Sequence, residues 1–196
     1  MYRPAYMVHD DVQAMHALVA AHPLGTLVLQ TPDGLCADHI PLLITPPTAQ
    51  APFGTLRGHV ARANPLWQRA GSEVLAIFRA SDGYVSPSLF DEKAISGKVV
   101  PTWNYAVVHA HGQLRAIDDA QSVLAIVEAL TRRHEAHMPQ PWSVHDTPRE
   151  YLDKMLQAIV GIEIDIVRME GKWKGSQNRG AADFARIQQA VPVTFG

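Results

Sequence analysis

The clearest signal for the fold is the segment Gly25-Thr-Leu-Val-Leu-Gln-Thr31-Pro-Asp-Gly34-Leu-Cys-Ala-Asp-His-Ile-Pro-Leu-Leu-Ile44. Residues 25–30 are a short apolar run, and Thr31-Pro-Asp-Gly34 has the composition of a tight turn. The apolar residues resume directly after the turn. We therefore predict that residues 35–44 return as the antiparallel partner of residues 25–30.

Other segments also have the pattern of β-strands. Ile162-Glu-Ile-Asp-Ile166 alternates apolar and acidic residues, which is the two-residue period of a half-buried antiparallel strand. Residues 103–117 divide at Gly112, so we predict a hairpin there. Further strands are predicted at residues 54–60, 73–78 and 83–86.

The longest predicted helix begins at Asp118 and ends before Pro139 and Pro141. Its apolar stripe has helical spacing and consists of Val123, Ile126, Val127 and Leu130. Shorter helical segments are predicted after an Asp10 cap as far as Pro23, at residues 64–69 and at residues 148–157.

These strands outnumber the helices and do not alternate regularly with them. That order favours an α+β fold, with an antiparallel sheet or barrel and helices packed outside it, over a parallel doubly wound sheet. A chain of 196 residues is long enough for one well-made core, so we predict a single domain.

The composition limits the classes of function. The chain has 17 Lys and Arg against 19 Asp and Glu and a formal net charge of −2, which is unlike a surface built to bind nucleic acid. It has no apolar run of membrane-spanning length and does not open on a signal-peptide pattern. The single Cys36 fits a reducing compartment, and its apolar strand predicts a buried, inert thiol. We therefore expect a cytoplasmic protein.

A first candidate site is Gly58-His-Val-Ala-Arg-Ala-Asn-Pro-Leu-Trp67. A strand followed by a short helix would place Arg62 and Asn64 beside free backbone amides, an arrangement that suits an anion. The alternative is that Arg62 is a solvated surface residue and Asn64 a helix cap.

A second candidate is Gly97-Lys-Val-Val-Pro-Thr-Trp-Asn-Tyr105. On a strand, Trp103 and Tyr105 share one face while Thr102 and Asn104 share the other. Such a pair of faces could form an apolar slot with a polar rim for a flat aromatic ligand, or an ordinary aromatic core position.

A third candidate is Glu170-Gly-Lys-Trp-Lys-Gly-Ser-Gln-Asn178, where two lysines, a serine and a glutamine could close over an anion. A solvated turn is the alternative.

Metal binding and nucleophilic catalysis have little support in the sequence. His109 and His111 are two residues apart, but no third ligand has a diagnostic spacing, and we expect no metal site. The chain has no Gly-x-Ser-x-Gly, Gly-x-Gly-x-x-Gly or Walker A motif.

Several blocks of sequence nevertheless occur together in a characteristic order. They are Met1-Tyr-Arg-Pro, His22-Pro-Leu-Gly-Thr26, His39-Ile-Pro-Leu-Leu43, Gly58 to Trp67, Gly97 to Tyr105, Pro141-Trp142, Ile159-Val-Gly-Ile-Glu163 and Gly171-Lys-Trp-Lys-Gly-Ser-Gln-Asn178. From Met1 to about Asp183 the chain closely resembles the PaiB family, described as FMN-binding negative transcriptional regulators of the FMN-binding split-barrel superfamily.

This resemblance implies a six-stranded, antiparallel Greek-key split β-barrel with peripheral helices. Residues 1–196 would form one domain, with a helical segment at 118–157 and a C-terminal strand and helix at 159–190. It also implies FMN as the cofactor and a homodimer with the flavin sites at the subunit interface. The flavin-binding residues that the resemblance selects are His59, Arg62, Asn64, Lys98, Thr102, Asn104, Lys172, Lys174, Ser176 and Gln177.

Two functions follow from the resemblance. The first is a PaiB-type regulator, which the acidic net charge suggests acts through a partner protein or a metabolite rather than by strong direct binding to DNA. The second is an FMN-dependent oxidoreductase, similar to a flavin reductase or a pyridoxamine-phosphate oxidase and acting on a small molecule. A haem-binding split barrel is a third alternative, based only on the ten histidines.

Overall fold

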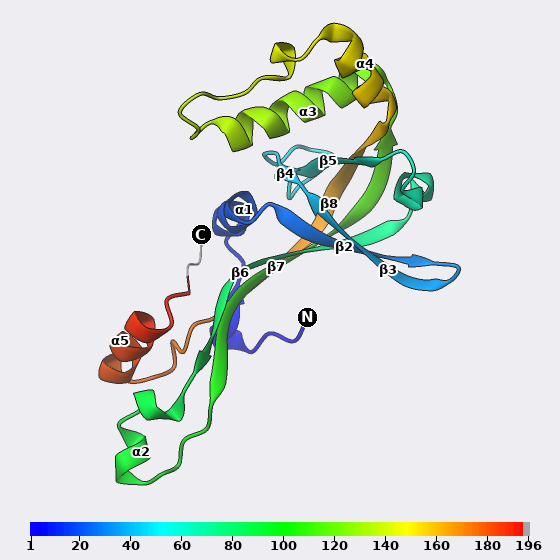
Figure 1. Cartoon of the computed structure of the whole chain (residues 1–196). Coiled ribbons are helices and arrows are strands. Elements are labelled where there is room, and N and C mark those ends of the chain that lie inside the picture. The colour runs from blue at the N-terminus through cyan, green and yellow to red at the C-terminus, as the bar shows by residue number, and fades with distance from the viewer. Residues whose placement is uncertain (194–196) are drawn as a thin grey trace. The chain divides into compact units, whose positions relative to one another are not determined.

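The structure, a computed structural model, describes residues 1–193 and has an α+β architecture (Figure 1). The strands are β1 (Val8–His9), β2 (Leu24–Thr31), β3 (Gly34–Pro41), β4 (Leu43–Ile44), β5 (Thr55–Ala61), β6 (Glu73–Val85), β7 (Thr102–Ile117) and β8 (Ile159–Lys174). The α-helices are α1 (Val12–Ala21), α2 (Glu92–Ile95), α3 (Ala120–Glu135), α4 (Arg149–Gln157) and α5 (Ala181–Ala190). Short 3-10 helices are η1 (Ala5–Met7), η2 (Pro65–Arg69), η3 (Pro87–Leu89) and η4 (Val144–Asp146).

The strands form one sheet in the order β3-β2-β6-β7-β8-β5-β4, and β1 pairs with β8. The pairs β1–β8, β2–β3, β2–β6, β4–β5 and β5–β8 are all antiparallel. The α+β class with an antiparallel sheet is therefore confirmed. The sheet has eight strands instead of the predicted six, and in residues 1–193 its path of hydrogen-bonded strands ends at β3 and β4 without closing.

The chain divides into two compact units, and each is described by itself. Unit 1 consists of residues 1–22, 78–109 and, within the described chain, 169–193. Unit 2 consists of residues 23–77 and 110–168. The strands β6, β7 and β8 each have residues in both units.

Unit 2 contains the predicted hairpin. β2 and β3 pair from Leu24 with Pro41 to Thr31 with Gly34, as the turn composition indicates. The return strand ends at Pro41 and not at the predicted residue 44. The Leu42 N–H still donates to the Pro23 carbonyl oxygen, at 2.9 Å, whereas residues 43–44 pair with β5. Cys36 lies exposed on β3, so the prediction of a buried thiol is wrong.

The core of unit 2 follows the predicted periodicities. Ile162, Ile164 and Ile166 of β8 are fully buried, and the apolar face of α3 packs on α4 through a cluster formed by Val123, Val144, Leu152 and Leu156. The N-cap of α3 is Asp119, one residue after the predicted start, because its carboxylate accepts the Ser122 N–H at 2.9 Å.

Two predicted breaks are wrong, because the chain continues as one strand through each of them. Residues 73–85 form the single strand β6, and residues 102–117 form β7 without a turn at Gly112. A Cβ atom at Gly112 would overlap the carbonyl oxygen of Asp165 on β8. This glycine is therefore needed for the close approach of two backbones and not for a turn.

Unit 1 contains α1, whose N-cap is Asp11 instead of the predicted Asp10. The Asp11 carboxylate accepts the N–H groups of Gln13 and Ala14, at 2.8 and 3.3 Å. A small apolar cluster in this unit joins Val85, Phe90 and Ile187, the last of which lies on α5. Among the helices of residues 1–193, none has the length and apolar character that a membrane crossing requires.

Candidate functional site

A cationic cluster lies in unit 1, where β7 and β8 are neighbours in the sheet. Lys172 and Lys174 are two residues apart on β8, so their side chains leave the strand on the same face. Their Nζ atoms lie 5.4 and 5.7 Å from the centre of the Tyr105 ring on β7. Both distances are within the range of cation–π contacts, so the aromatic ring helps to hold two positive charges together.

Lys172 Nζ also lies 5.7 Å from the centre of the Tyr2 ring, and the hydrogen bonds of both lysines are to neutral oxygens. Lys174 Nζ donates to Thr102 Oγ1 at 2.7 Å, and Lys172 Nζ donates to the Tyr2 carbonyl oxygen at 3.0 Å. Lys172 is only 8% exposed. Within residues 1–193 neither ammonium group is paired with a carboxylate, and a buried charge without a counter-ion is costly. The cluster is therefore suited to an anion.

Asn104 and Ser176 form the buried part of the same region. Ser176 Oγ donates to Asn104 Oδ1 at 2.8 Å, and the Asn104 side chain is fully buried. Asn104 Nδ2 has no hydrogen-bond acceptor among the described residues. An unpaired buried donor costs about 1–3 kcal/mol, which an acceptor on a ligand would offset. Ser176 also has a positive φ of 61°, a conformation that is uncommon for a residue with a side chain.

Gln177 holds the loop that follows β8. Its Nε2 donates to the carbonyl oxygens of Tyr6 and Trp173, both at 2.7 Å, and its Oε1 accepts the Gly175 N–H at 2.8 Å. Both ends of the amide thus bind this chain's own backbone. The interactions that the structure shows for Gln177 position the loop beside the two lysines.

An aromatic surface adjoins the cluster in unit 1. Trp103, Tyr105 and Val107 alternate on one face of β7 and, with Arg79 and Asp82, line a pocket of about 460 Å³. Tyr84 meets Trp103 edge-on, with ring centres 6.0 Å apart and planes at 67°. Trp103 is 52% exposed, so it does not occupy the aromatic core position that was one alternative for it.

The predicted residues His59, Arg62 and Asn64 lie in unit 2. Arg62 donates from Nε to the Gln157 carbonyl oxygen at 2.8 Å and from Nη2 to that of Ile159 at 3.0 Å. Its two terminal nitrogens also reach the carboxylate of Asp118, at 3.1 and 2.5 Å. These hydrogen bonds raise the pKa of Arg62 and hold the pKa of Asp118 below its ordinary value. The guanidinium joins the end of β5 to the segments that flank α3 and α4.

Asn64 has the capping role that was its alternative interpretation. Its Oδ1 accepts the Leu66 N–H at 2.9 Å at the start of η2, and its Nδ2 donates to Asp38 Oδ1 at 3.0 Å. His59 is half-buried on β5, and its Nδ1 has no partner among residues 1–193. Burial lowers the pKa of His59, because it disfavours the charged ring.

Five of the ten predicted residues meet in unit 1: Thr102, Asn104, Lys172, Lys174 and Ser176. Lys98 is exposed in the loop before β7, and the described residues show no contact between its side chain and this cluster. The sequence did not single out Tyr2 as a neighbour of the site. Tyr2 reaches Lys172 through the pairing of β1 with β8, and no local pattern signals a contact between residues so far apart in sequence.

Comparison with known proteins gives a consistent picture. A family model described as "Putative FMN-binding domain" matches residues 1–168. An uncharacterized protein of Emericella nidulans is 33% identical over 93% of this chain and 87% of its own length. The protease synthase and sporulation protein PAI 2 of Bacillus subtilis is 28% identical over 95% of this chain and 87% of its own length.

Two solved structures share the fold at low sequence identity. The FAD- and haem-binding protein of Mycobacterium smegmatis has a TM-score of 0.65 at 16% identity, covering 96% of this chain and 83% of that one. The flavocytochrome Anf3 of Azotobacter vinelandii has a TM-score of 0.64 at 12% identity, covering 94% of this chain and 78% of that one. At these identities the likeness concerns the fold alone.

Proposed function

This chain belongs to the family of FMN-binding domains and its cofactor is a flavin, and from that premise we propose that the cationic cluster of unit 1 binds FMN. The observation that carries the proposal is the pair of ammonium groups, Lys172 and Lys174, that lack a carboxylate partner among residues 1–193. The cluster would hold the cofactor through Thr102, Asn104, Lys172, Lys174 and Ser176.

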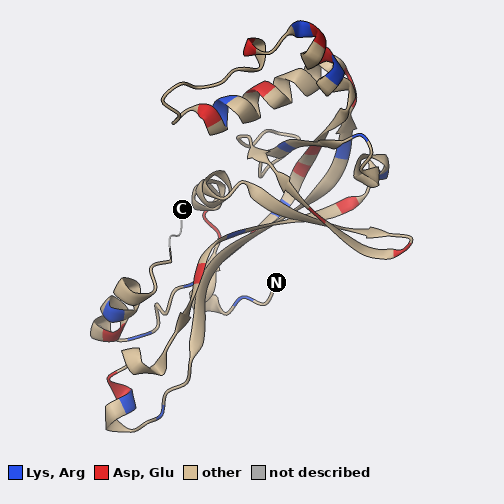
Figure 2. Ribbon diagram, in the orientation of Figure 1, with Lys and Arg blue, Asp and Glu red and all other residues tan. Residues whose placement is uncertain are grey.

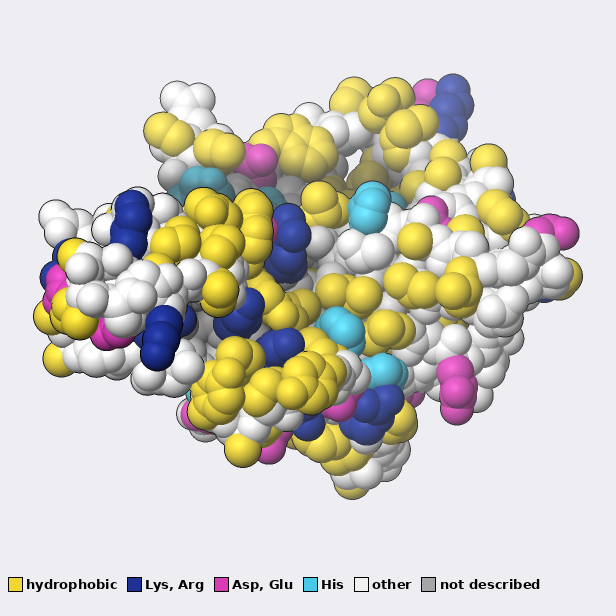
Figure 3. Space-filling model, turned by 90° about the horizontal axis from the view of Figure 1, so that it is seen from below, with side chains coloured by type: hydrophobic (Ala, Val, Ile, Leu, Met, Phe, Trp, Pro, Cys, Tyr) yellow, Lys and Arg dark blue, Asp and Glu magenta, His cyan; other side chains and the backbone are white. Residues whose placement is uncertain are grey.

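The chemistry of this donor set fits FMN. A phosphate monoester is satisfied by ammonium and hydroxyl donors, and Lys172, Lys174 and Thr102 supply such groups. The unpaired Asn104 Nδ2 can donate to a ring carbonyl or ring nitrogen. A flat aromatic ring also needs an apolar surface, which Trp103 and Tyr105 provide. Figure 3 likewise shows basic side chains set among hydrophobic ones on one face of the molecule.

When bound, FMN supplies the transfer of one or two electrons. The chain's own residues bind and orient it. The two lysines would balance the phosphate charge. The hydrogen bond from Ser176 would orient Asn104, so that its amide could donate to the polar edge of the flavin ring. Gln177 would keep the loop in place through its bonds to the backbone.

The biological role that we propose is that of a negative transcriptional regulator of the PaiB type that acts without strong direct binding to DNA. The net charge of −2 supports this part of the proposal. In Figure 2, basic and acidic residues are scattered along the ribbon of each unit and are not gathered on one helix or strand. Regulation would then pass through a protein partner or a metabolite.

A second candidate function is that of an FMN-dependent oxidoreductase, of the flavin-reductase or pyridoxamine-phosphate-oxidase type. It is favoured by the exposure of Trp103, at 52%, because a flavin ring that lies against an exposed surface can be reached by a second small molecule. Oxidation of NADH or NADPH by the flavin-loaded protein would support this function over a purely regulatory one.

The finer architecture belongs to the same proposal. We infer a single split-barrel domain that forms a cytoplasmic homodimer, with the flavin sites at the subunit interface. The assignments of His59, Arg62, Asn64, Lys98 and Gln177 to the flavin site stay predictions of the family resemblance.

The proposed site is tested by titrating the protein with FMN and following flavin fluorescence. Lys174→Met removes the charge but keeps an apolar chain of similar length, and we expect it to weaken FMN binding about 10- to 100-fold, since a hydrogen bond to a charged group contributes roughly 1.5–3 kcal/mol. The matched control is Lys154→Met, on the exposed side of α4, which should leave the affinity unchanged. Equal affinities for the two variants would remove Lys174 from the site.

A further inference from the structure

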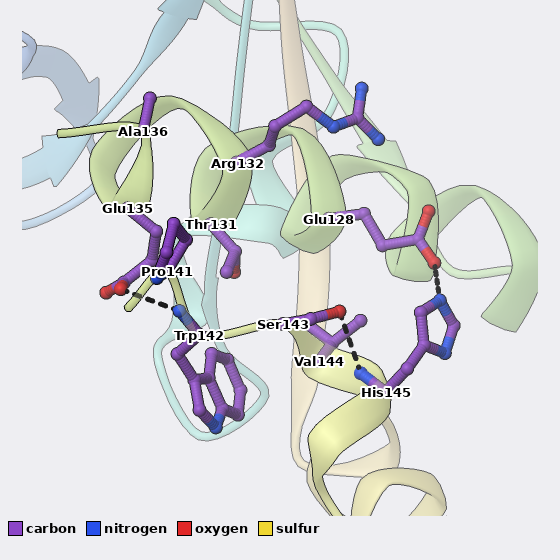
Figure 4. Close-up of a pocket in the computed structure, with 10 residues that line it drawn as sticks. All are labelled: Glu128, Thr131, Arg132, Glu135, Ala136, Pro141, Trp142, Ser143, Val144 and His145. Atoms are coloured by element: carbon purple, nitrogen blue, oxygen red, sulfur yellow. Dashed lines mark hydrogen bonds and ion pairs between the residues drawn. The ribbon is translucent and has the colours of Figure 1, made fainter. Parts of the chain in front are cut away.

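A separate cavity lies in unit 2, between one face of α3 and the segment 141–145 that leads into η4 (Figure 4). Its volume is about 440 Å³, within the range of roughly 300–1,000 Å³ that is typical of small-molecule sites. No residue that lines it belongs to the proposed flavin site. The residues that matter for its chemistry are Glu128, Thr131, Glu135, Trp142 and Val144.

The α3 side of this cavity is polar and acidic. Glu128, Thr131 and Glu135 follow each other at i, i+3 and i+7, so they form one stripe on the helix. Figure 4 shows all three directed toward the segment 141–145, whereas Arg132 points away from it. Arg132 and His145 also line the cavity, so the carboxylates of Glu128 and Glu135 are the acidic part of a mixed lining.

Each carboxylate uses one oxygen to hold the segment in place. Glu135 Oε2 accepts the Trp142 N–H at 2.9 Å, and Glu128 Oε1 lies 3.0 Å from His145 Nε2. Within residues 1–193, the second oxygen of Glu135 and the hydroxyl of Thr131 have no partner. Because Thr131 and Glu135 are one helical turn apart, these two acceptors lie next to each other at one end of the cavity.

The opposite wall is apolar. Trp142 is 47% exposed, Val144 is buried, and Pro141 extends the same wall. An aromatic face beside a free carboxylate oxygen suits an organic cation, because the ammonium pairs with the carboxylate while the ring attracts the charge and covers the carbon chain. The free carboxylate oxygen of Glu135 disfavours an anion at that end of the cavity, and a purely apolar ligand would cover the carboxylate without replacing its water.

We propose that this cavity binds a small primary amine with a hydrophobic body. The ammonium group binds Glu135 and Thr131, and the body packs against Trp142. This site is independent of the flavin site, and it gives the protein a second class of small-molecule ligand.

The test uses the full-length, FMN-loaded protein and the probe 2-phenylethylamine. Binding is followed by NMR from the indole N–H signal of Trp142, which the Trp142→Phe variant identifies. We expect a saturable shift of this signal. Glu135→Gln keeps an acceptor for the Trp142 N–H but removes the charge, and it should weaken amine binding at least about tenfold. The control Glu150→Gln, exposed on α4, should bind the amine like the unaltered protein.

Two further measurements separate the amine site from a merely apolar pocket. The neutral analogue 2-phenylethanol should give no saturable shift, and Thr131→Val, which is a conservative change on the helix, should weaken amine binding about threefold or more. The proposal is overturned if the alcohol binds as tightly as the amine or if Glu135→Gln binds the amine with unchanged affinity. It is also overturned if the amine gives no saturable shift up to about 20 mM, which corresponds to less than roughly 2.3 kcal/mol of binding.

Discussion

The two basic segments that the sequence marks as anion sites have opposite surroundings in the structure. Lys172 and Lys174 in unit 1 contact an aromatic ring and neutral oxygens, and no carboxylate in residues 1–193 neutralises them. Arg62 in unit 2 is bound to the carboxylate of Asp118 and to two backbone carbonyl oxygens. A basic residue in a promising motif is thus available to a ligand only when the fold leaves its charge without a protein partner.

Among variants that test this difference between the two units, we expect the largest effect from removing the buried amide of Asn104 in unit 1. The double variant Asn104→Leu/Ser176→Ala removes both partners of the 2.8 Å hydrogen bond, and replacing both by apolar groups costs little stability. The donor Asn104 Nδ2 is lost at the same time, so we expect FMN binding to weaken about 5- to 20-fold. The measurement is an FMN titration together with thermal unfolding of the flavin-free protein.

The control for this variant is Thr131→Val in unit 2, which should leave FMN affinity unchanged. If the double variant bound FMN with full affinity while remaining folded, Asn104 would not contact the cofactor.

We expect a smaller effect from Arg62→Ala, which should lower the thermal stability of the protein more than its affinity for FMN. The variant breaks the link from β5 to Asp118 and to the end of α4, so we expect the midpoint of thermal unfolding to fall by a few degrees. The affinity of the folded variant for FMN should stay within about threefold of the original. Arg69→Ala, at the end of η2, is a nearby basic control.

The same experiment can show whether Arg62 of unit 2, and not only the lysines of unit 1, binds the FMN phosphate. A loss of FMN affinity as large as that of Lys174→Met would return Arg62 to the phosphate site, as the family resemblance predicts.

The smallest effect concerns the dependence of stability on pH. Burial lowers the pKa of His59 from its ordinary value of 6.5, so the unfolded chain takes up the proton first as the pH falls. The folded state therefore loses stability as the pH falls below 6.5. The His59→Gln variant has no imidazole at this position, so its free energy of unfolding should fall less over the same pH range. Urea unfolding of both proteins at about pH 7.5 and about pH 5.5 measures the difference. An identical loss in both proteins would show that other groups account for the acid sensitivity.

Local patterns predicted the elements whose register depends on near neighbours. The turn at Thr31 to Gly34 set the β2–β3 hairpin, and the alternating isoleucines of β8 are fully buried. The helical stripe of α3 likewise lies in the core of unit 2. In each case the period of hydrophobic residues over a few turns or strand positions was sufficient.

Local sequence patterns predicted only part of the candidate site. The sequence marked Lys172, Lys174 and Asn104 because their residue types suit an anionic, aromatic ligand. It did not show that Ser176 would fix Asn104, since the two lie 72 residues apart. Nor did it show that Asp118 would take the guanidinium of Arg62, 56 residues away.

What the sequence by itself determined is therefore the class of fold, the main hairpin and the apolar faces, while its set of flavin-binding residues stays a prediction. Tertiary structure alone decided that β6 and β7 run unbroken, with the backbone of β8 lying against Gly112 of β7. It also decided that Lys172 and Lys174 have no carboxylate partner among residues 1–193. The physical reason is the range of the interactions. Hydrophobic period and turn composition act between neighbours in the chain, whereas the partner of a charge or of a buried amide is chosen by contacts between distant segments.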